Sequence, residues 1–190
     1  MVNSINDFKA NLRGGGARAN QFKITINKPT GIRLDGFDSR RTSFLVTAAA
    51  LPDTAMNFFS VPFRGRSIQY PGDRPEPGDW STTFYNDTDF MIRNAMEQWS
   101  NGINDFENNT GVVRPSEFQT TLEIDQLDRD DRVLKSYELI NCFPTTISSI
   151  ELTTAAQDAI ETFSVTWKYT HIRSSGVSTG FGGRTGSVVS

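Results

Sequence analysis

The 190-residue sequence has little of what catalytic and metal sites require. It contains one cysteine, Cys142, and one histidine, His171. A single cysteine cannot form an internal disulfide, and a lone histidine completes neither a zinc site nor a catalytic triad. We therefore interpret His171 as a structural residue and Cys142 as a small buried apolar side chain. The sequence predicts no catalytic residue, no metal ligand and no cofactor.

Long apolar runs and an excess of positive charge are also absent. The most apolar run, FLVTAAAL at residues 44–51, is far shorter than a membrane-spanning helix. The N-terminal residues do not resemble a signal peptide, so we expect a protein that folds in a reducing compartment. With 19 basic and 22 acidic residues, the formal net charge is −3, which argues against a protein built to grip nucleic acid.

Nucleotide-binding and acid-pair motifs are missing or incomplete. The stretch GFGGRTG at residues 180–186 has Thr185 where a dinucleotide fingerprint requires glycine, and no helix follows it. Carboxylates such as Asp73 and Asp79 lie in turns beside arginines, which favours solvated or ion-paired roles over a glycosidase-like acid pair. We therefore do not expect an enzyme.

Alternation of apolar and polar residues is the main pattern that is present. It predicts half-buried strands at residues 21–27, 79–86 and 161–172, and two hairpins. One hairpin covers residues 56–70 and turns near Arg64–Gly65, and the other covers residues 117–140. Residues 42–50 are more continuously apolar, so we predict a strand that is covered on both faces.

Helical spacing is confined to two segments. The main helix is predicted within residues 87–103, with Asp87 or Thr88 as its N-cap. A short helix capped by Ser4 precedes three glycines, and serine and glycine dominate the end of the chain. The sequence therefore divides into an N-terminal arm at 1–20, a β domain at 21–173 and a Gly/Ser-rich C-terminal extension at 174–190.

The run YPGDRPEPGDW at residues 70–80 is a candidate contact segment. Its prolines restrict the backbone, its glycines allow sharp bends, and Trp80 is expected to anchor its end in the core. A solvated connector and an active-site loop are the alternatives. We predict contacts between subunits or rings through the following residues: Pro71, Gly72, Asp73, Arg74, Glu76 and Asp79.

Many half-buried strands in one chain leave strand edges that must be covered. Unpaired edges promote aggregation, and pairing with neighbouring copies into a closed ring of strands removes them. Self-assembly is therefore the function that the residues favour.

Several stretches, in order along the chain, resemble the tail tube proteins of contractile-tailed (myovirus-type) bacteriophages. They are ARANQFKITI (17–26), AAALP (48–52), GDRPEPGDWSTTFYND (72–87), CFPTTIS (142–148) and FSVTWKY (163–169). Two features depart from the family pattern. Ala19 stands where the family often has proline, and the chain continues well beyond Arg173.

The resemblance implies a mainly β (α+β) fold, a tail-tube β-barrel or sandwich with one flanking helix. Its inner strands would form a continuous barrel in a hexameric ring, and stacked rings would form the inner tail tube that conducts the genome when the sheath contracts. The implied partners are further copies of the chain, the sheath protein, baseplate and tail-terminator proteins, and phage DNA that passes without specific binding. The implied location is the virion tail, after assembly in the host cytoplasm.

Polar strand faces are the candidates for the lining of such a tube. Alternation offers two sets of residues: Thr120, Gln126 and Lys135, or Ser164, Thr166 and Lys168. Threonine- and serine-rich faces on a mildly acidic protein would hold phosphates only weakly.

Other functions remain open at this point. The chain could be a baseplate tube initiator or the inner-tube protein of a phage-derived contractile injection system, which copy number per particle would distinguish. A small carbohydrate-binding β domain would instead use Trp80, Trp99 or Trp167 as a sugar platform, and it requires an exposed tryptophan in a cleft. All three tryptophans lie on the apolar phase of their predicted elements.

Overall fold

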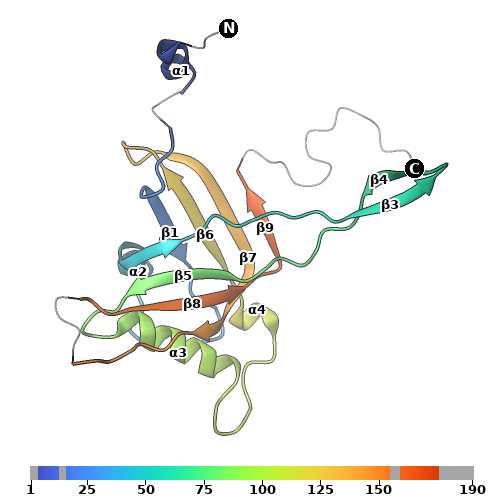
Figure 1. Cartoon of the computed structure of the whole chain (residues 1–190). Helices are drawn as coiled ribbons and strands as arrows, with labels where there is room; N and C mark the ends of the chain where they lie inside the picture. Colours follow the sequence, from blue (N-terminus) through green and yellow to red (C-terminus); the bar gives the residue numbers. More distant parts are fainter. Residues whose placement is uncertain (1–3, 13–15, 155–158, 176–190) are drawn as a thin grey trace.

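The computed structural model describes residues 4–12, 16–154 and 159–175 (Figure 1). Most of the predicted C-terminal extension lies outside these residues. The helices are α1 (Ile5–Asn11), α2 (Ser39–Leu45), α3 (Met91–Ile103) and α4 (Pro115–Phe118). The strands are β1 (Phe22–Ile26), β2 (Val46–Ala49), β3 (Phe58–Phe63), β4 (Arg66–Pro71), β5 (Trp80–Tyr85), β6 (Thr120–Leu127), β7 (Val133–Ile147), β8 (Thr162–Lys168) and β9 (His171–Ser174).

Two antiparallel sheets share the long strand β7. Sheet A contains β1, β6, the first part of β7 and β9, whereas sheet B contains the end of β7, β8, β5 and β2. The change occurs at Asn141, whose φ of 59° lies in the left-handed region. A residue in this conformation interrupts the regular pleat, so the strand turns from one sheet into the other.

The core lies between the two sheets and is closed on one side by α3 (Figure 1). Trp99 of α3 meets Trp167 of β8 with 5.6 Å between their ring centroids. Trp80, Trp99 and Trp167 are only 3%, 0% and 0% exposed. The sugar-platform alternative is therefore wrong, because it needs an exposed tryptophan. The prediction that Trp80 anchors its segment in the core is confirmed.

The predicted strand at residues 42–50 is wrong over its first half. Asp38 caps α2, because its Oδ1 accepts a hydrogen bond from the backbone N–H of Arg40 at 2.9 Å. Thr42 adds a hydrogen bond from its hydroxyl to the Asp38 carbonyl. Phe44 is 77% exposed, so the segment is not covered on both faces. Only β2 is extended, and it lies at the end of sheet B.

The main helix begins later than predicted, and its predicted caps are wrong. The α3 helix starts at Met91, after Phe90, whose φ is 53°. The backbone N–H of Phe90 donates to the Asp87 carbonyl at 2.8 Å, so residues 87–90 form a turn before the helix. The short helix at the N-terminus is confirmed, with Ser4 in a capping box.

The last predicted strand is two strands that belong to different sheets. β8 lies in sheet B and β9 pairs with β7 in sheet A. Tyr169 and Thr170 lie between the two strands and make the crossing, and the backbone N–H of Thr170 donates to the carbonyl of Ile140 at 2.9 Å. Both predicted hairpins are confirmed, and the 117–140 hairpin continues to Ile147 but begins with the short helix α4 rather than a strand.

Candidate functional site

The β3–β4 hairpin projects from the body of the molecule (Figure 1), and every residue of both strands is exposed. Arg64 and Gly65 form its turn with φ values of 46° and 80°. Positive φ at both central residues is typical of the primed turns that join twisted antiparallel strands. An isolated two-stranded hairpin is marginally stable in water, so this arm is suited to packing against another surface.

One face of the hairpin concentrates its apolar side chains. Directly paired residues point to the same side of a sheet, and the pairs on this face are Phe59 with Tyr70, Val61 with Ile68, and Phe63 with Arg66. The rings of Phe59 and Tyr70 stack with 5.7 Å between their centroids. The opposite face pairs Ser60 with Gln69, Pro62 with Ser67 and, at the base of the hairpin, Phe58 with Pro71. The hairpin therefore offers a partner one largely apolar face and one more polar face.

The predicted contact segment forms the base of this hairpin and its return to the body. The backbone N–H of Gly72 donates to the Asn57 carbonyl at 2.7 Å, which extends the pairing beyond Pro71. Asp73, Arg74 and Glu76 are exposed. Asp79 lies at the other end, where its carboxylate pairs with the Lys168 ammonium at 2.5 Å. Contacts of these residues with other copies stay a prediction.

Trp80 fixes the body end of this segment. Its indole N–H donates to the carbonyl of Ala50 at 2.7 Å, and its ring is buried. Ala50 directly follows β2, so the bond joins the two chain segments that lead to and from the hairpin. The hairpin is thus attached to the core at a defined point.

The outward face of sheet B is rich in hydroxyl groups. Ser81 lies opposite Thr166, and the hydroxyls of Thr83 and Ser164 lie 3.0 Å apart. Lys168 is on the same face of β8, and its charge is paired with Asp79. Ser164, Thr166 and Lys168 are therefore brought together, as the sequence predicted, on a face turned away from the core.

The other predicted polar set, Thr120, Gln126 and Lys135, lies on the core-facing side of sheet A. Phe22, Gln126 and Lys135 form one cross-strand row, and Phe22 packs against the core. The Gln126 amide donates to the carbonyls of Arg18 and Gln21, both at 2.7 Å. Thr120 lies next to the buried Cys142. We therefore carry only the sheet B set into the proposal below.

Sheet B ends in two strand edges that have one partner each among the described residues. β2 pairs only with β5, and Phe143–Ile147 of β7 pair only with β8. Thr145 and Thr146 are exposed, and so is Ala48 in β2. Such edges are templates for pairing with another chain.

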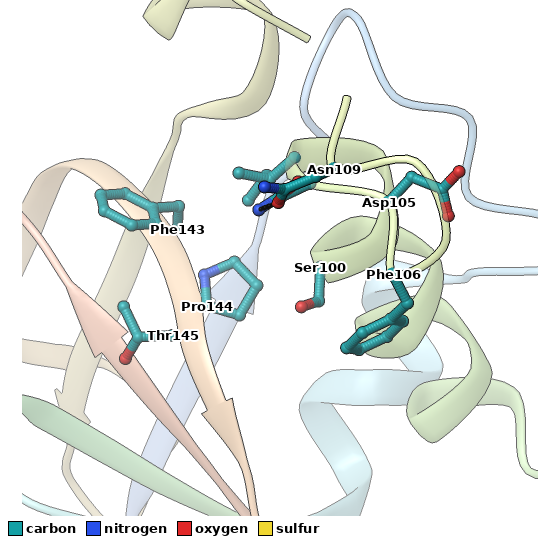
Figure 2. Close-up of a pocket in the computed structure, with 9 residues that line it drawn as sticks. Ser100, Asp105, Phe106, Asn109, Phe143, Pro144 and Thr145 are labelled. Carbon is teal, nitrogen blue, oxygen red and sulfur yellow. Dashed lines mark hydrogen bonds between the residues drawn. The ribbon is translucent and has the colours of Figure 1, made fainter. Parts of the chain in front are cut away.

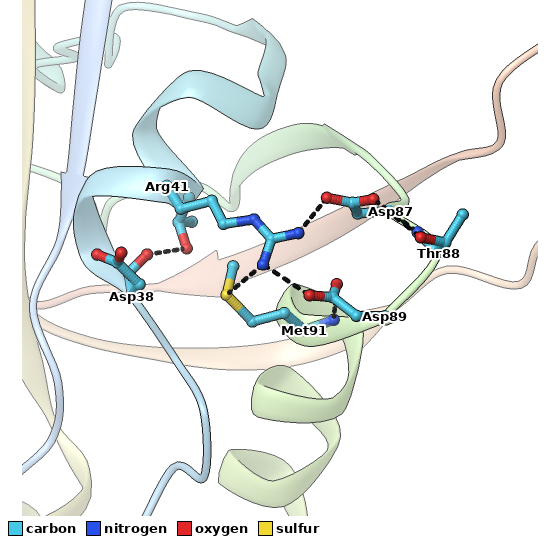
Figure 3. Close-up of polar contacts among 7 residues, drawn as sticks. Asp38, Arg41, Asp87, Thr88, Asp89 and Met91 are labelled. Carbon is cyan, nitrogen blue, oxygen red and sulfur yellow. Dashed lines mark hydrogen bonds and ion pairs between the residues drawn. The ribbon is translucent and has the colours of Figure 1, made fainter.

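A cluster of charges ties α2 to the turn before α3 (Figure 3). The Arg41 guanidinium donates to the carboxylates of both Asp87 and Asp89, at 2.6 Å for Asp89. The hydrogen bond from Arg41, with a smaller contribution from its positive charge, lowers the pKa of Asp87, and the hydrogen bonds to the two carboxylates raise the pKa of Arg41. Asp89 also accepts the backbone N–H of Met91 at 3.2 Å, so the cluster positions the start of α3.

An open hollow of about 400 Å³ lies between the loop after α3 and β7 (Figure 2). Ser100, Ile103 and Asn104 line it from α3 and its end, Asp105, Phe106 and Asn109 from the loop, and Phe143, Pro144 and Thr145 from β7.

The described residues contain no cluster of histidine, cysteine, aspartate and glutamate that could hold a metal ion. Over the same part of the chain, no helix has the length and apolarity needed to cross a membrane. Cys142 is buried, and burial raises the pKa of its thiol to about 12, so the thiolate is scarce at neutral pH. His171 lies exposed in β9.

Sequence reasoning found the hairpin and its turn but missed the apolar face and the Arg41 cluster. The alternation of Phe59, Val61 and Phe63 was a visible signal, yet it is equally typical of a buried strand. Arg41 and Asp87 are 46 positions apart, so only the fold brings them together.

Comparison with known proteins points to one family. Residues 17–174 match the family described as "Phage tail tube protein". The tail tube protein of Serratia phage KSP90 is 28% identical over 168 residues, which cover 87% of this chain and 94% of that protein. Tail tube protein gp19 of Enterobacteria phage T4 is 27% identical over 154 residues, covering 80% of this chain and 88% of that protein.

Solved structures share the fold at lower sequence identity. A chain of the sheath-tube complex of the extracellular contractile injection system PVC, in the extended state, aligns with a TM-score of 0.59 at 12% identity, covering 90% of this chain and 97% of that chain. A chain of the anti-feeding prophage cap aligns with a TM-score of 0.59 at 17% identity, covering 84% and 90%. These likenesses concern the fold alone.

Proposed function

The chain belongs to the phage tail tube protein family, and from this premise we propose that six copies close into a ring and that rings stack into the inner tube of the tail. The resemblance found in the sequence is thereby confirmed, and so is the expectation of a structural, non-enzymatic protein of the virion tail. The ring, the stacking and the passage of the genome are the proposal.

The observation that carries the ring is the pair of free edges of sheet B. β2 of one copy would pair with Phe143–Ile147 of the next, which joins different surfaces of identical chains. Contacts of this heterologous kind form a closed ring when the rotation from one copy to the next is a whole-number fraction of 360°. Closure would leave no edge free, so the sheets of all copies would become one barrel.

The outward face of sheet B would line the tube. That face turns away from the core of each copy, so closing sheet B into a barrel around an axis places it on the inside. Ser164 and Thr166 offer neutral hydroxyls, and Lys168 is already paired with Asp79. Each DNA phosphate bound by an unpaired cation adds salt-dependent affinity. A lining whose charges are already paired would therefore bind DNA weakly and let it pass.

The hairpin and its base would join one ring to the next. The hairpin extends beyond the body by about 20 Å, given six residues per strand at about 3.3 Å each. Its apolar face needs a partner, and Pro71, Gly72, Asp73, Arg74, Glu76 and Asp79 hold it at a fixed place. In this arrangement, sheath contraction would drive the tube as a rigid body, with baseplate and terminator proteins at its two ends.

A cysteine cross-linking experiment tests the ring directly. In a variant with Ala48→Cys and Thr145→Cys, mild oxidation should join β2 of each copy to β7 of its neighbour. We expect a ladder of covalent species that ends at the hexamer on a denaturing gel. The native Cys142 is buried and should not contribute.

The matched control carries Thr145→Cys with Arg129→Cys, which lies in the β6–β7 turn and outside the proposed pairing. This control should give no ladder. Rings visible by electron microscopy together with no A48C/T145C ladder would contradict the proposed edge pairing. A ladder that continues past six would contradict the hexamer.

A further inference from the structure

Both edge strands of sheet B leave one residue out of their pairing. The register of β2 with β5 skips Thr47, and the register of β7 with β8 skips Thr145. An extra residue of this kind is a β-bulge. In the middle of the sheet, the six cross-strand pairs between β5 and β8 follow one another without a shift. Within the described residues of sheet B, the bulges therefore lie only on the two strands that have a free edge.

A threonine hydroxyl fixes each bulge in the same way. The Thr47 hydroxyl donates a hydrogen bond to the carbonyl of Thr83 in β5 at 3.2 Å. The Thr145 hydroxyl donates to the carbonyl of Thr166 in β8, also at 3.2 Å. Each bond ties the skipped residue to the strand beside it. The bulges are thus formed before another copy binds, which lowers the entropic cost of association.

The bulges change the spacing of the core-facing residues in both strands. In a regular strand, successive residues on one face are two positions apart. Val46 and Ala49 of β2 both pack against the core and are three positions apart. In β7, the buried Pro144 and the core-packed Ile147 have the same spacing. The two edges therefore match each other in spacing but do not match a regular strand.

The edges of sheet A are different. Along the described residues, the pairing of β1 with β6 and of β9 with β7 proceeds without a register shift. A regular strand laid against a bulged edge would match its core-facing residues on one side of the bulge only, because the two strands are out of phase beyond it. The spacing therefore disfavours pairing between an edge of sheet A and an edge of sheet B.

We propose that the Thr47 and Thr145 bulges set the register in which β2 of one copy pairs with β7 of the next. In an antiparallel arrangement, the core-facing residues meet at both ends of the segment in one register: Val46 opposite Ile147 and Ala49 opposite Pro144. In that register Ala48 lies opposite Thr145, so the A48C/T145C cross-link joins directly paired positions. This inference rests on the proposed function and assigns the fit between neighbouring copies to two residues.

Deleting one bulge residue tests the match. Removal of Thr47 leaves the pairs on either side of it in consecutive register with β5, so the variant should keep its cooperative unfolding. The core-facing residues of β2 would then be two positions apart, against three in β7. Ring formation should therefore need a protein concentration at least about tenfold higher than for the wild type. Deletion of Thr145 should have the same effect, because it shortens the spacing in β7 instead.

Deleting both threonines should restore the fit. Without Thr47 and Thr145, both edges have the spacing of a regular strand and match again. The double deletion should therefore form assemblies at a lower concentration than either single deletion, whereas two independent defects would add. Sedimentation velocity over a series of concentrations measures the association, and melting curves followed by circular dichroism check the fold of each variant.

Thr47→Val and Thr145→Val test the bulges without a change in chain length. Each substitution keeps the β-branched shape and removes the hydroxyl hydrogen bond, so each should weaken the association of neighbouring copies by about fivefold. Thr25→Val is the matched control. Thr25 lies in β1, an edge strand of sheet A with a regular register, and this variant should assemble like the wild type.

The outcomes separate this inference from the proposed function. Wild-type rings together with unimpaired single deletions, or with a double deletion that assembles less well than both, would overturn the role of the bulges and leave the ring in place. If the deletion variants do not fold, association of T47V and T145V equal to that of the wild type would overturn it. Failure of the wild-type protein to form rings at any concentration would instead overturn the proposed function, and this inference with it.

Discussion

At the scale of single residues, Arg41 shows how a charged side chain can organise the boundary between two elements. Its guanidinium contacts two carboxylates from the turn before α3 and the sulfur of Met91, at 3.9 Å, at the start of that helix. The side chains of Arg41 and Asp87 remain 41% and 35% exposed. Solvent therefore screens the pair, and its role is to position the turn more than to supply a large share of stability.

The Arg41 cluster predicts a pH dependence of stability. Since Arg41 lowers the pKa of Asp87 below its ordinary value of 3.8, the pairing stabilises the fold fully above that value and less as pH falls through the lowered pKa. Arg41→Ala should reduce the melting temperature near neutral pH and make its decline between about pH 5 and about pH 2 shallower.

Melting curves followed by circular dichroism at a series of pH values would measure this change. Arg40→Ala is the neighbouring control, because Arg40 is exposed and contributes only its backbone to the α2 cap. Equal acid sensitivity in the wild type and the R41A variant would contradict the proposed role of the pair.

A buried hydrogen bond gives a second prediction at this scale. The indole N–H of Trp167 donates to the hydroxyl of Thr82 at 2.9 Å, and both residues are buried. Thr82→Val keeps the shape but leaves the N–H without its acceptor, so the free energy of unfolding should fall by about 1–3 kcal/mol. Urea unfolding of the dilute protein would measure it.

Thr83→Val is the matched control for this substitution. Its hydroxyl faces outward and pairs with Ser164, which can turn to water instead. The loss should therefore stay below about 1 kcal/mol. An equal loss in the free energy of unfolding for the two substitutions would contradict a larger contribution from the buried hydrogen bond.

At the scale of elements, the sequence was most informative where the alternation of apolar and polar residues continued without interruption. The strand alternation in β1, β5 and β6 predicted the apolar faces correctly, because one face of each strand is buried. It failed at residues 42–50, where a helix capped by Asp38 changes into the edge strand β2 within one apolar run. Periodicity alone cannot separate a short helix from a buried strand, and the cap was the only local signal.

The β3–β4 hairpin is the element whose removal should separate folding from assembly. Replacing residues 58–71 with a short Gly/Ser linker removes no buried side chain, since both strands are exposed throughout. The shortened protein should keep the circular dichroism spectrum and cooperative unfolding of the β domain. Its rings should no longer stack into tubes in electron micrographs.

Loss of cooperative unfolding after this replacement would contradict the view of the hairpin as an independent arm. The conservative control replaces Ser60 and Gln69 by alanine on the polar face of the hairpin. These residues share a hydrogen bond of 3.1 Å but lie away from the apolar face, so this variant should still form tubes.

At the scale of the whole molecule, what the sequence could not supply was the placement of strands between sheets. The change of β7 from sheet A to sheet B depends on Asn141, whose conformation has no signature in the alternation around it. Thr120 and Gln126 share the phase of the buried Leu122 and Ile124 in β6, so the alternation itself places them on the core-facing side. Only Lys135 needed the structure, because the register of β6 with β7 brings it opposite Gln126.

The lining proposed for the tube makes a prediction about the assembled particle. Ser164→Lys with Thr166→Lys adds unpaired cations to the outward face of sheet B, and each phosphate contact with DNA then has to break during passage. Tubes of this variant should retain short DNA fragments at low salt and release them as salt rises, whereas wild-type tubes should retain little. Lysines at Ser60 and Gln69, outside the proposed lining, are the control.

The central claim is that the chain by itself can form a hollow tube of stacked six-membered rings. Electron microscopy of the purified wild-type protein, concentrated at moderate salt and with averaging of end-on views, tests this claim most directly. The account predicts rings with six-fold symmetry around an open centre and, at higher concentration, hollow tubes built from them. Closed rings with a different number of copies, or filaments with no central channel, would contradict it.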